Sequence, residues 1–229
     1  MKQTRFLLEV TLCFAVFFLP GYLSQGNEPP NGLLETSLML QSILLGVPQF
    51  LLMVYIASLS RETPLADWGF SAFRGSDFLR AALVFVGCFA IFTPFAILIV
   101  SLPSKIARYL SGGFRWKLTG VSQVPLAVFF GLTAGYREEF FFRSYLLQRL
   151  DQLGLPLPVC VAASTILFCS GHLYQGPLGI ATSAGLGILF ASVYLRRRNL
   201  HVIAIAHGLY NASVLCLSLL RTTPLSSPP

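Results

Sequence analysis

Seven long apolar stretches restrict what this chain can fold into. They lie near residues 6–23, 33–59, 78–102, 121–150, 157–173, 178–195 and 201–220. Most are long enough for a helix rising about 1.5 Å per residue to cross a hydrocarbon core of about 30 Å. We therefore predict an all-α fold, a polytopic membrane helix bundle with about seven transmembrane helices. The expected range is six to eight, because the 121–150 stretch is long enough to be broken and the 157–173 stretch is short.

The composition is that of a membrane protein. Hydrophobic residues make up 55% of the 229 residues, charged residues make up 11%, and the mean hydropathy is +0.70. Such a chain is far too apolar for a soluble domain of this size. The formal net charge is +7, yet the basic residues are scattered over short loops without a basic stripe, so we expect no nucleic-acid partner.

The distribution of basic residues predicts the orientation. Lys2 and Arg5 precede the first apolar stretch, as in a signal peptide, but Glu9 interrupts that stretch and no small-residue cleavage site follows it. We therefore expect a retained first helix. An N-terminus in the cytoplasm places more basic residues on the inner side than on the outer side, although the basic loop at 104–119 favours the opposite orientation. We predict a multi-pass integral membrane protein with a cytoplasmic N-terminus.

Two adjacent glutamates, Glu138 and Glu139, are the acidic residues that lie deep inside an apolar stretch. An ionisable residue at membrane depth costs at least about 2.5 kcal/mol, so such residues indicate a functional site. Glu139 and Arg143 are four residues apart with the acid first, which favours a helical ion pair. Glu138 points about 100° away around the helix and is left without that partner. A free carboxylate of this kind is suited to proton transfer.

Two histidines and an asparagine supply further polar groups. His172 closes the fifth apolar stretch and shares a helix face with Phe168, whereas His207 and Asn211 share one face of the seventh. Each has a structural explanation by itself, such as an interfacial histidine or an asparagine that bonds between helices. Together they allow one carboxylate, two imidazoles and one carboxamide to converge between helices.

The joint pattern of these residues is more specific than each residue alone. Residues 138–143 match E-E-x-x-x-R, residues 168–172 match F-x-x-x-H, and residues 207–211 match H-x-x-x-N, in that order on successive apolar helices. This order resembles the CAAX-protease and bacteriocin-processing (CPBP, or Abi) family of intramembrane proteases, which includes the prenyl-protein endopeptidases. The resemblance covers about 123–217. It divides the chain into N-terminal transmembrane helices without family motifs (1–120), a catalytic CPBP core (121–221) and a tail expected to be disordered (222–229).

The resemblance implies a glutamic intramembrane endopeptidase that hydrolyses a peptide bond of a membrane-associated protein or peptide. Glu138 with His172 would activate a water, and His207 with Asn211 would donate hydrogen bonds to the oxyanion. Glu139 and Arg143 would support this site. No cofactor is expected. The substrates of such relatives include prenylated C-terminal tails, double-glycine leader peptides and C-terminal membrane-anchor sorting tails, and the sequence does not choose among them.

Two alternatives stay open at this point. Glu138, His172 and His207 are acceptable zinc ligands with a fourth position left for water, although the usual H-E-x-x-H motif is absent. The second alternative is a membrane transporter or a non-catalytic scaffold that uses a buried Glu/His network. Transporters often carry inverted repeats, and none is visible in this sequence.

Overall fold

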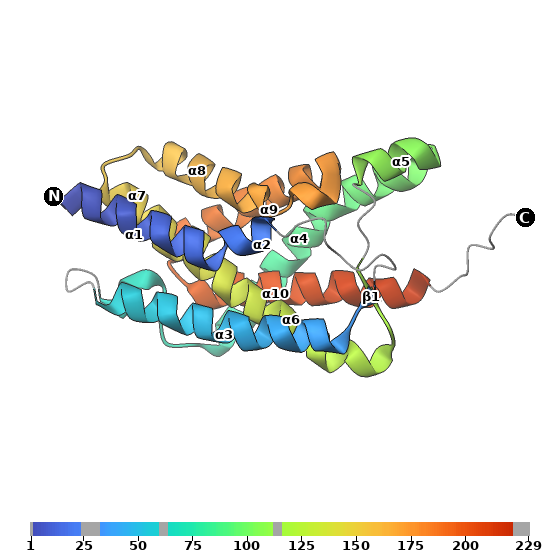
Figure 1. The fold of residues 1–229 in the computed structure, drawn as a ribbon, viewed down its shortest axis with the longest axis horizontal. Coiled ribbons are helices and arrows are strands. Elements are labelled where there is room, and N and C mark those ends of the chain that lie inside the picture. The colour runs from blue at the N-terminus through green and yellow to red at the C-terminus, as the bar shows by residue number, and fades with distance from the viewer. Residues whose placement is uncertain (1, 24–32, 60–63, 112–115, 222–229) are drawn as a thin grey trace, which may run out of the picture.

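The computed structural model describes residues 2–23, 33–59, 64–111 and 116–221 and is predominantly helical there (Figure 1). The α-helices are α1 (Lys2–Phe17), α2 (Leu19–Leu23), α3 (Thr36–Ser58), α4 (Gly75–Ser101), α5 (Ser104–Leu110), α6 (Val124–Glu139), α7 (Leu146–Gln152), α8 (Leu157–Ser170), α9 (Gly176–Arg197) and α10 (Leu200–Leu217). The predicted tail at 222–229 lies outside the described residues.

Short elements connect these helices. The 3-10 helices are η1 (Leu65–Trp68), η2 (Val121–Gln123), η4 (Leu173–Gln175) and η5 (Ser218–Arg221), and η3 (Phe140–Tyr145) is a π-helix. The strands β1 (Leu33–Leu34) and β2 (Lys117–Leu118) pair in parallel. This two-residue ladder joins the start of α3 to the chain that enters α6.

Within the described residues, four helical stretches are long and apolar enough to cross a membrane. They are Thr36–Ser58, Gly75–Ser101, Leu173–Arg197 and Leu200–Leu220, and the apolar helix Leu157–Ser170 is shorter. These stretches confirm an all-α membrane bundle but not the predicted count of about seven crossings. Large apolar side chains on α3 and α4, such as Leu44, Leu83 and Val100, are exposed, as expected for faces that meet lipid.

The 121–150 stretch is not broken into separate helices. Helices α6 and α7 continue into each other through η3, which begins directly after Glu138 and Glu139. All six residues of η3 are buried. A π-helical turn inside an α-helix is frequently found at functional sites. Here the π-helical turn changes the helix register directly after Glu138 and Glu139, which are the last two residues of α6.

Glycines bring the backbones of α6 and α10 into direct contact. A methyl group on Gly131 would collide with the carbonyl oxygen of Gly208, and one on Gly135 would collide with the carbonyl oxygen of Ala204. Gly208 in turn packs on the backbone of Leu132. Small residues four apart allow this kind of close approach between membrane helices. The contact sets the end of α6 beside the first half of α10.

A partly buried ion pair joins α1 to α7. Arg149 donates to Glu9 at 2.7 Å, and Tyr145 also donates to Glu9. The Arg149 guanidinium lies 4.5 Å from the ring centroid of Phe6 and 5.1 Å from that of Trp68. Because Glu9 is held in this way, α1 runs along α7 (Figure 1), and α2 follows it toward the end of α8.

We expect Gly135→Ala to destabilise the protein. Helix propensity alone predicts a gain of about 1 kcal/mol for this change, whereas collision of the methyl with α10 predicts a net loss of about 1–3 kcal/mol. Thermal unfolding in detergent, followed by near-ultraviolet circular dichroism, shows whether Gly135→Ala raises or lowers the unfolding temperature. Gly75→Ala is the matched control, because no neighbouring atom lies within 4 Å of a methyl there. An equal or higher unfolding temperature for Gly135→Ala would contradict the close contact.

Candidate active site

The two adjacent glutamates have different surroundings. Glu139 is fully buried, with Oε2 3.3 Å from Nε of Arg143 and Oε1 2.7 Å from Nδ1 of His207. The Glu139–Arg143 pair predicted from spacing therefore forms. Its second partner, His207, comes from α10 and was not predicted. Glu139 is thus held by one group from η3, which continues α6, and by one group from α10.

Aromatic rings enclose the buried guanidinium of Arg143. Its centre lies 4.2 Å from the ring centroid of Phe168 and at 5.6 and 5.8 Å from those of Phe142 and Phe190. A methyl on Gly187 of α9 would lie 3.2 Å from its Nη2. The missing side chain of Gly187 therefore leaves room for the cation. The rings stabilise its charge through cation–π interactions, together with Glu139.

His207 bridges the two acids. Since a carboxylate only accepts hydrogen bonds, the 2.7 Å contact requires His207 to donate its Nδ1 proton to Glu139 when Glu139 is ionised. Its Nε2 lies 3.9 Å from Oε2 of Glu138. The imidazole is buried and stacks on Phe190, with ring centroids 5.1 Å apart. The orientation of this ring is therefore fixed from three sides.

His172 lies in the turn between α8 and η4, not on a helix. Its Nδ1 is 2.9 Å from the carbonyl oxygen of Phe168. Because a carbonyl cannot donate, Nδ1 must carry the proton of this bond, and Nε2 of the neutral ring is left as an acceptor. The Phe168 ring lies 4.7 Å from the imidazole, so the predicted Phe168–His172 contact forms.

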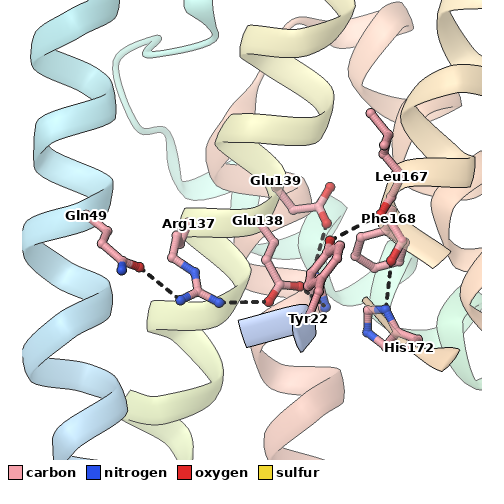
Figure 2. A network of polar contacts seen from close by, with 9 residues as sticks. Tyr22, Gln49, Arg137, Glu138, Glu139, Leu167, Phe168 and His172 are labelled. Carbon is pink, nitrogen blue, oxygen red and sulfur yellow. Dashed lines mark hydrogen bonds and ion pairs between the residues drawn. The ribbon is translucent and has the colours of Figure 1, made fainter. Parts of the chain in front are cut away.

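A cavity of about 200 Å³ brings Glu138 and His172 together. Rings of Phe18, Phe142 and Phe168 supply much of its wall, and Tyr22 of α2 also lines it. Figure 2 shows Tyr22 donating to the carbonyl oxygen of Leu167, a bond of 3.1 Å. Polar groups that converge in a cavity with aromatic walls are typical of a small-ligand or catalytic site.

The prediction that Glu138 lacks a cationic partner is wrong. Nη2 of Arg137 lies 3.4 Å from Oε1 of Glu138, and Nη1 of Arg137 donates to Gln49 of α3 at 3.2 Å (Figure 2). Neighbouring residues on a helix point in different directions, which is why spacing did not indicate this pair. The long side chain of Arg137 nevertheless bends back far enough for its guanidinium to reach the carboxylate of Glu138. Glu138 keeps 17% of its side chain exposed, in contrast to Glu139.

Asn211 lies apart from these contacts. It is half-buried, one turn after His207 on α10. Within the described part of the chain, no hydrogen bond joins it to Glu138, His172 or His207. The same part of the chain contains no group of three His, Cys, Asp or Glu side chains placed to hold a metal ion. The set proposed for zinc, Glu138 with the two histidines, therefore does not form a ligand sphere in this arrangement.

We expect Arg143→Gln to unfold the bundle at a lower temperature, because it leaves the buried Glu139 carboxylate without its cation. Loss of one partner of a buried pair costs about 3–5 kcal/mol. The double variant Glu139→Gln with Arg143→Gln should be more stable than Arg143→Gln alone. Arg108→Gln on the exposed face of α5 serves as control. Equal unfolding temperatures for Arg143→Gln and Arg108→Gln would exclude a stabilising role for the pair.

Comparison with known proteins finds a similarity over the second half of the chain. Residues 120–213 match the family model described as type II CAAX prenyl endopeptidase Rce1-like. No curated protein and no solved structure matches the chain. The matched segment runs from η2 into α10 and contains all three motifs, with Glu138 and His172 of the cavity and the Glu139–Arg143–His207 group. Over residues 120–213 the chain is therefore similar to the Rce1-like type II CAAX prenyl endopeptidases.

Proposed function

We propose that this chain is an intramembrane endopeptidase that removes the C-terminal tail of a prenylated CAAX protein by direct attack of water. One observation carries the proposal: Glu138 and His172, from two different motifs, line the same aromatic cavity. The description of the matching family supports a prenylated CAAX tail over the leader and anchor peptides that the sequence alone left open. A membrane-embedded bundle suits a substrate whose lipid group holds it at the bilayer.

Glu138 and His172 activate the water in this proposal. The Glu138 carboxylate takes a proton from a water molecule, and Nε2 of His172, left as an acceptor by the bond of Nδ1 to Phe168, orients that water. The water oxygen bonds to the scissile carbonyl carbon, whose oxygen becomes an oxyanion. Collapse of this intermediate breaks the C–N bond, and the proton on Glu138 passes to the leaving amine. No covalent enzyme intermediate forms.

His207 and Asn211 stabilise the oxyanion. His207 can donate through Nε2 only as the imidazolium, since its Nδ1 proton is directed at Glu139. Asn211 is the second donor, and it must approach from one turn further along α10 when substrate is bound. Glu139 and Arg143 hold His207 and the end of α6 in place. They do not contact the substrate.

The number of membrane crossings and the orientation of the chain are part of the same proposal. We infer about seven crossings, in which α1, the continuous α6–η3–α7 segment and α8 span the membrane in addition to the four longer apolar stretches. The N-terminus is cytoplasmic. Residues 1–120 form a helical support without family motifs, and residues 121–221 form the catalytic core.

We expect Glu138→Gln to abolish cleavage. The assay uses purified protein in liposomes and a quenched fluorescent peptide that ends in a farnesylated CAAX sequence, with the unprenylated peptide as the substrate control. Loss of a general base lowers the rate by about 10²–10⁴-fold. Glu35→Gln, at an exposed position before α3, should retain full activity. Cleavage by Glu138→Gln at the wild-type rate would overturn the proposed mechanism.

The same assay separates the alternatives. Full activity in the presence of a chelator is expected, whereas activity lost in chelator and restored by zinc would assign a metal mechanism. Transport coupled to a Glu/His relay would instead appear as ion flux across the liposome membrane without any cut peptide. A wild-type protein that cuts neither peptide would overturn the proposed function.

Asn211→Ala should reduce kcat by about 10²–10³-fold if its carboxamide is an oxyanion donor, because such a donor acts in the transition state. The KM of the farnesylated peptide should change little. Asn211→Ala should also unfold at the wild-type temperature, since the side chain makes no hydrogen bond in the described part of the chain. An unchanged kcat would remove Asn211 from the mechanism.

A further inference from the structure

A chain of polar contacts connects α3 to the proposed base. Gln49 of α3 accepts a hydrogen bond from Nη1 of Arg137 at 3.2 Å, and Nη2 of Arg137 lies 3.4 Å from Oε1 of Glu138. Figure 2 shows the three side chains in one line, with α3 on one side of the picture and the cavity residues on the other. Gln49 lies outside the segment 120–213 that carries the family match.

Helix packing fixes the first link of this chain. A methyl on Gly46 would collide with Cγ2 of Thr133, so α3 and α6 approach closely at that point. Gln49 is three residues after Gly46, and Arg137 is four residues after Thr133. Both side chains therefore lie one turn beyond the close contact and on the faces that meet there. The reach of Gln49 to Arg137 follows from the helix geometry.

The surroundings of Arg137 favour a single position of its guanidinium. Its centre lies 5.4 Å from the ring centroid of Phe18, and 26% of the side chain is exposed. With the ring on one side and Gln49 as an acceptor, two of its nitrogens are directed at Gln49 and Glu138. An arginine held by an acceptor and a ring loses less freedom when it binds a carboxylate.

We propose that Gln49 and Arg137 are positioning residues for the base. Gln49 orients the guanidinium of Arg137, and Arg137 holds Oε1 of Glu138, which leaves Oε2 to face His207 and the water. The proposal rests on the proposed function for its catalytic consequence. It also assigns a part in the site to α3, which carries none of the three motifs. Placement of a base is important for rate, since a displacement of about 1 Å can lower it about 100-fold.

A double-mutant cycle tests the proposal with kcat and KM on the farnesylated peptide. The variants are Gln49→Met, Arg137→Met and the double variant, and Gln41→Met at an exposed position of the same helix is the control. We expect kcat to fall about 3- to 10-fold for Gln49→Met, the worth of one hydrogen bond, and about 10- to 100-fold for Arg137→Met. KM should stay within about twofold, because neither residue is proposed to bind substrate.

The cycle distinguishes action through Arg137 from independent effects. If Gln49 acts through Arg137, Gln49→Met should have no further effect in the Arg137→Met background. Multiplicative losses, or an unchanged kcat in Gln49→Met, would overturn the proposal. Equal losses in Gln41→Met and Gln49→Met would also overturn it, because they would indicate a general effect on α3.

An infrared measurement provides a readout that needs no activity. The carboxylate stretching band of Glu138 is identified as the band that Glu138→Gln removes. This band should shift in Gln49→Met and in Arg137→Met and stay in place in Gln41→Met. If the band shifts in both variants but the wild-type protein does not cut the peptide, Gln49 and Arg137 still position Glu138 and the proposed function is refuted. If the wild type cuts the peptide but the band does not shift in either variant, only the positioning role of Gln49 and Arg137 is refuted.

Discussion

The backbone contact between α6 and α10 is the constraint on which the rest of the site depends. Gly135 lies one turn before Glu139, and Gly208 follows His207 directly in the chain. When these glycines meet, Glu139 comes within 2.7 Å of His207. A larger side chain at either glycine would separate the helices and with them the acid and the imidazole. The polar chemistry of the site is thus placed by an apolar feature of two helices.

The two glutamates differ because of what surrounds them. Glu139 has no exposed surface and is held by Arg143 and His207, so its oxygens are committed to protein partners. Glu138 keeps some exposure, faces the cavity and has Arg137 on one oxygen. Adjacent residues of identical chemistry are thereby given separate tasks, one in holding the helices and one in proton transfer.

Sequence reasoning found the parts of this site that follow from local spacing. The three motifs, the Glu139–Arg143 pair and the Phe168–His172 contact all lie within one or two turns, where helix geometry is known. It missed the contact of Arg137 with Glu138 because this contact depends on the length of the arginine side chain and not on helical spacing. It missed Gln49 because 88 residues separate it from Arg137, and only the packing at Gly46 brings them together. The spacing of Gly131 and Gly135 was visible in the sequence, but the helix that they contact was not.

The most direct test of this account compares Glu138→Gln with Glu139→Gln in two measurements, the thermal unfolding temperature and the cleavage of the farnesylated peptide. We predict that Glu138→Gln unfolds like the wild type and does not cut, because its carboxylate is needed for chemistry and not for packing. Glu139→Gln should unfold at a clearly lower temperature, because the Arg143 cation is left buried without its counter-ion. The same loss of unfolding temperature in both variants, or cleavage by Glu138→Gln, would contradict the division between the two acids.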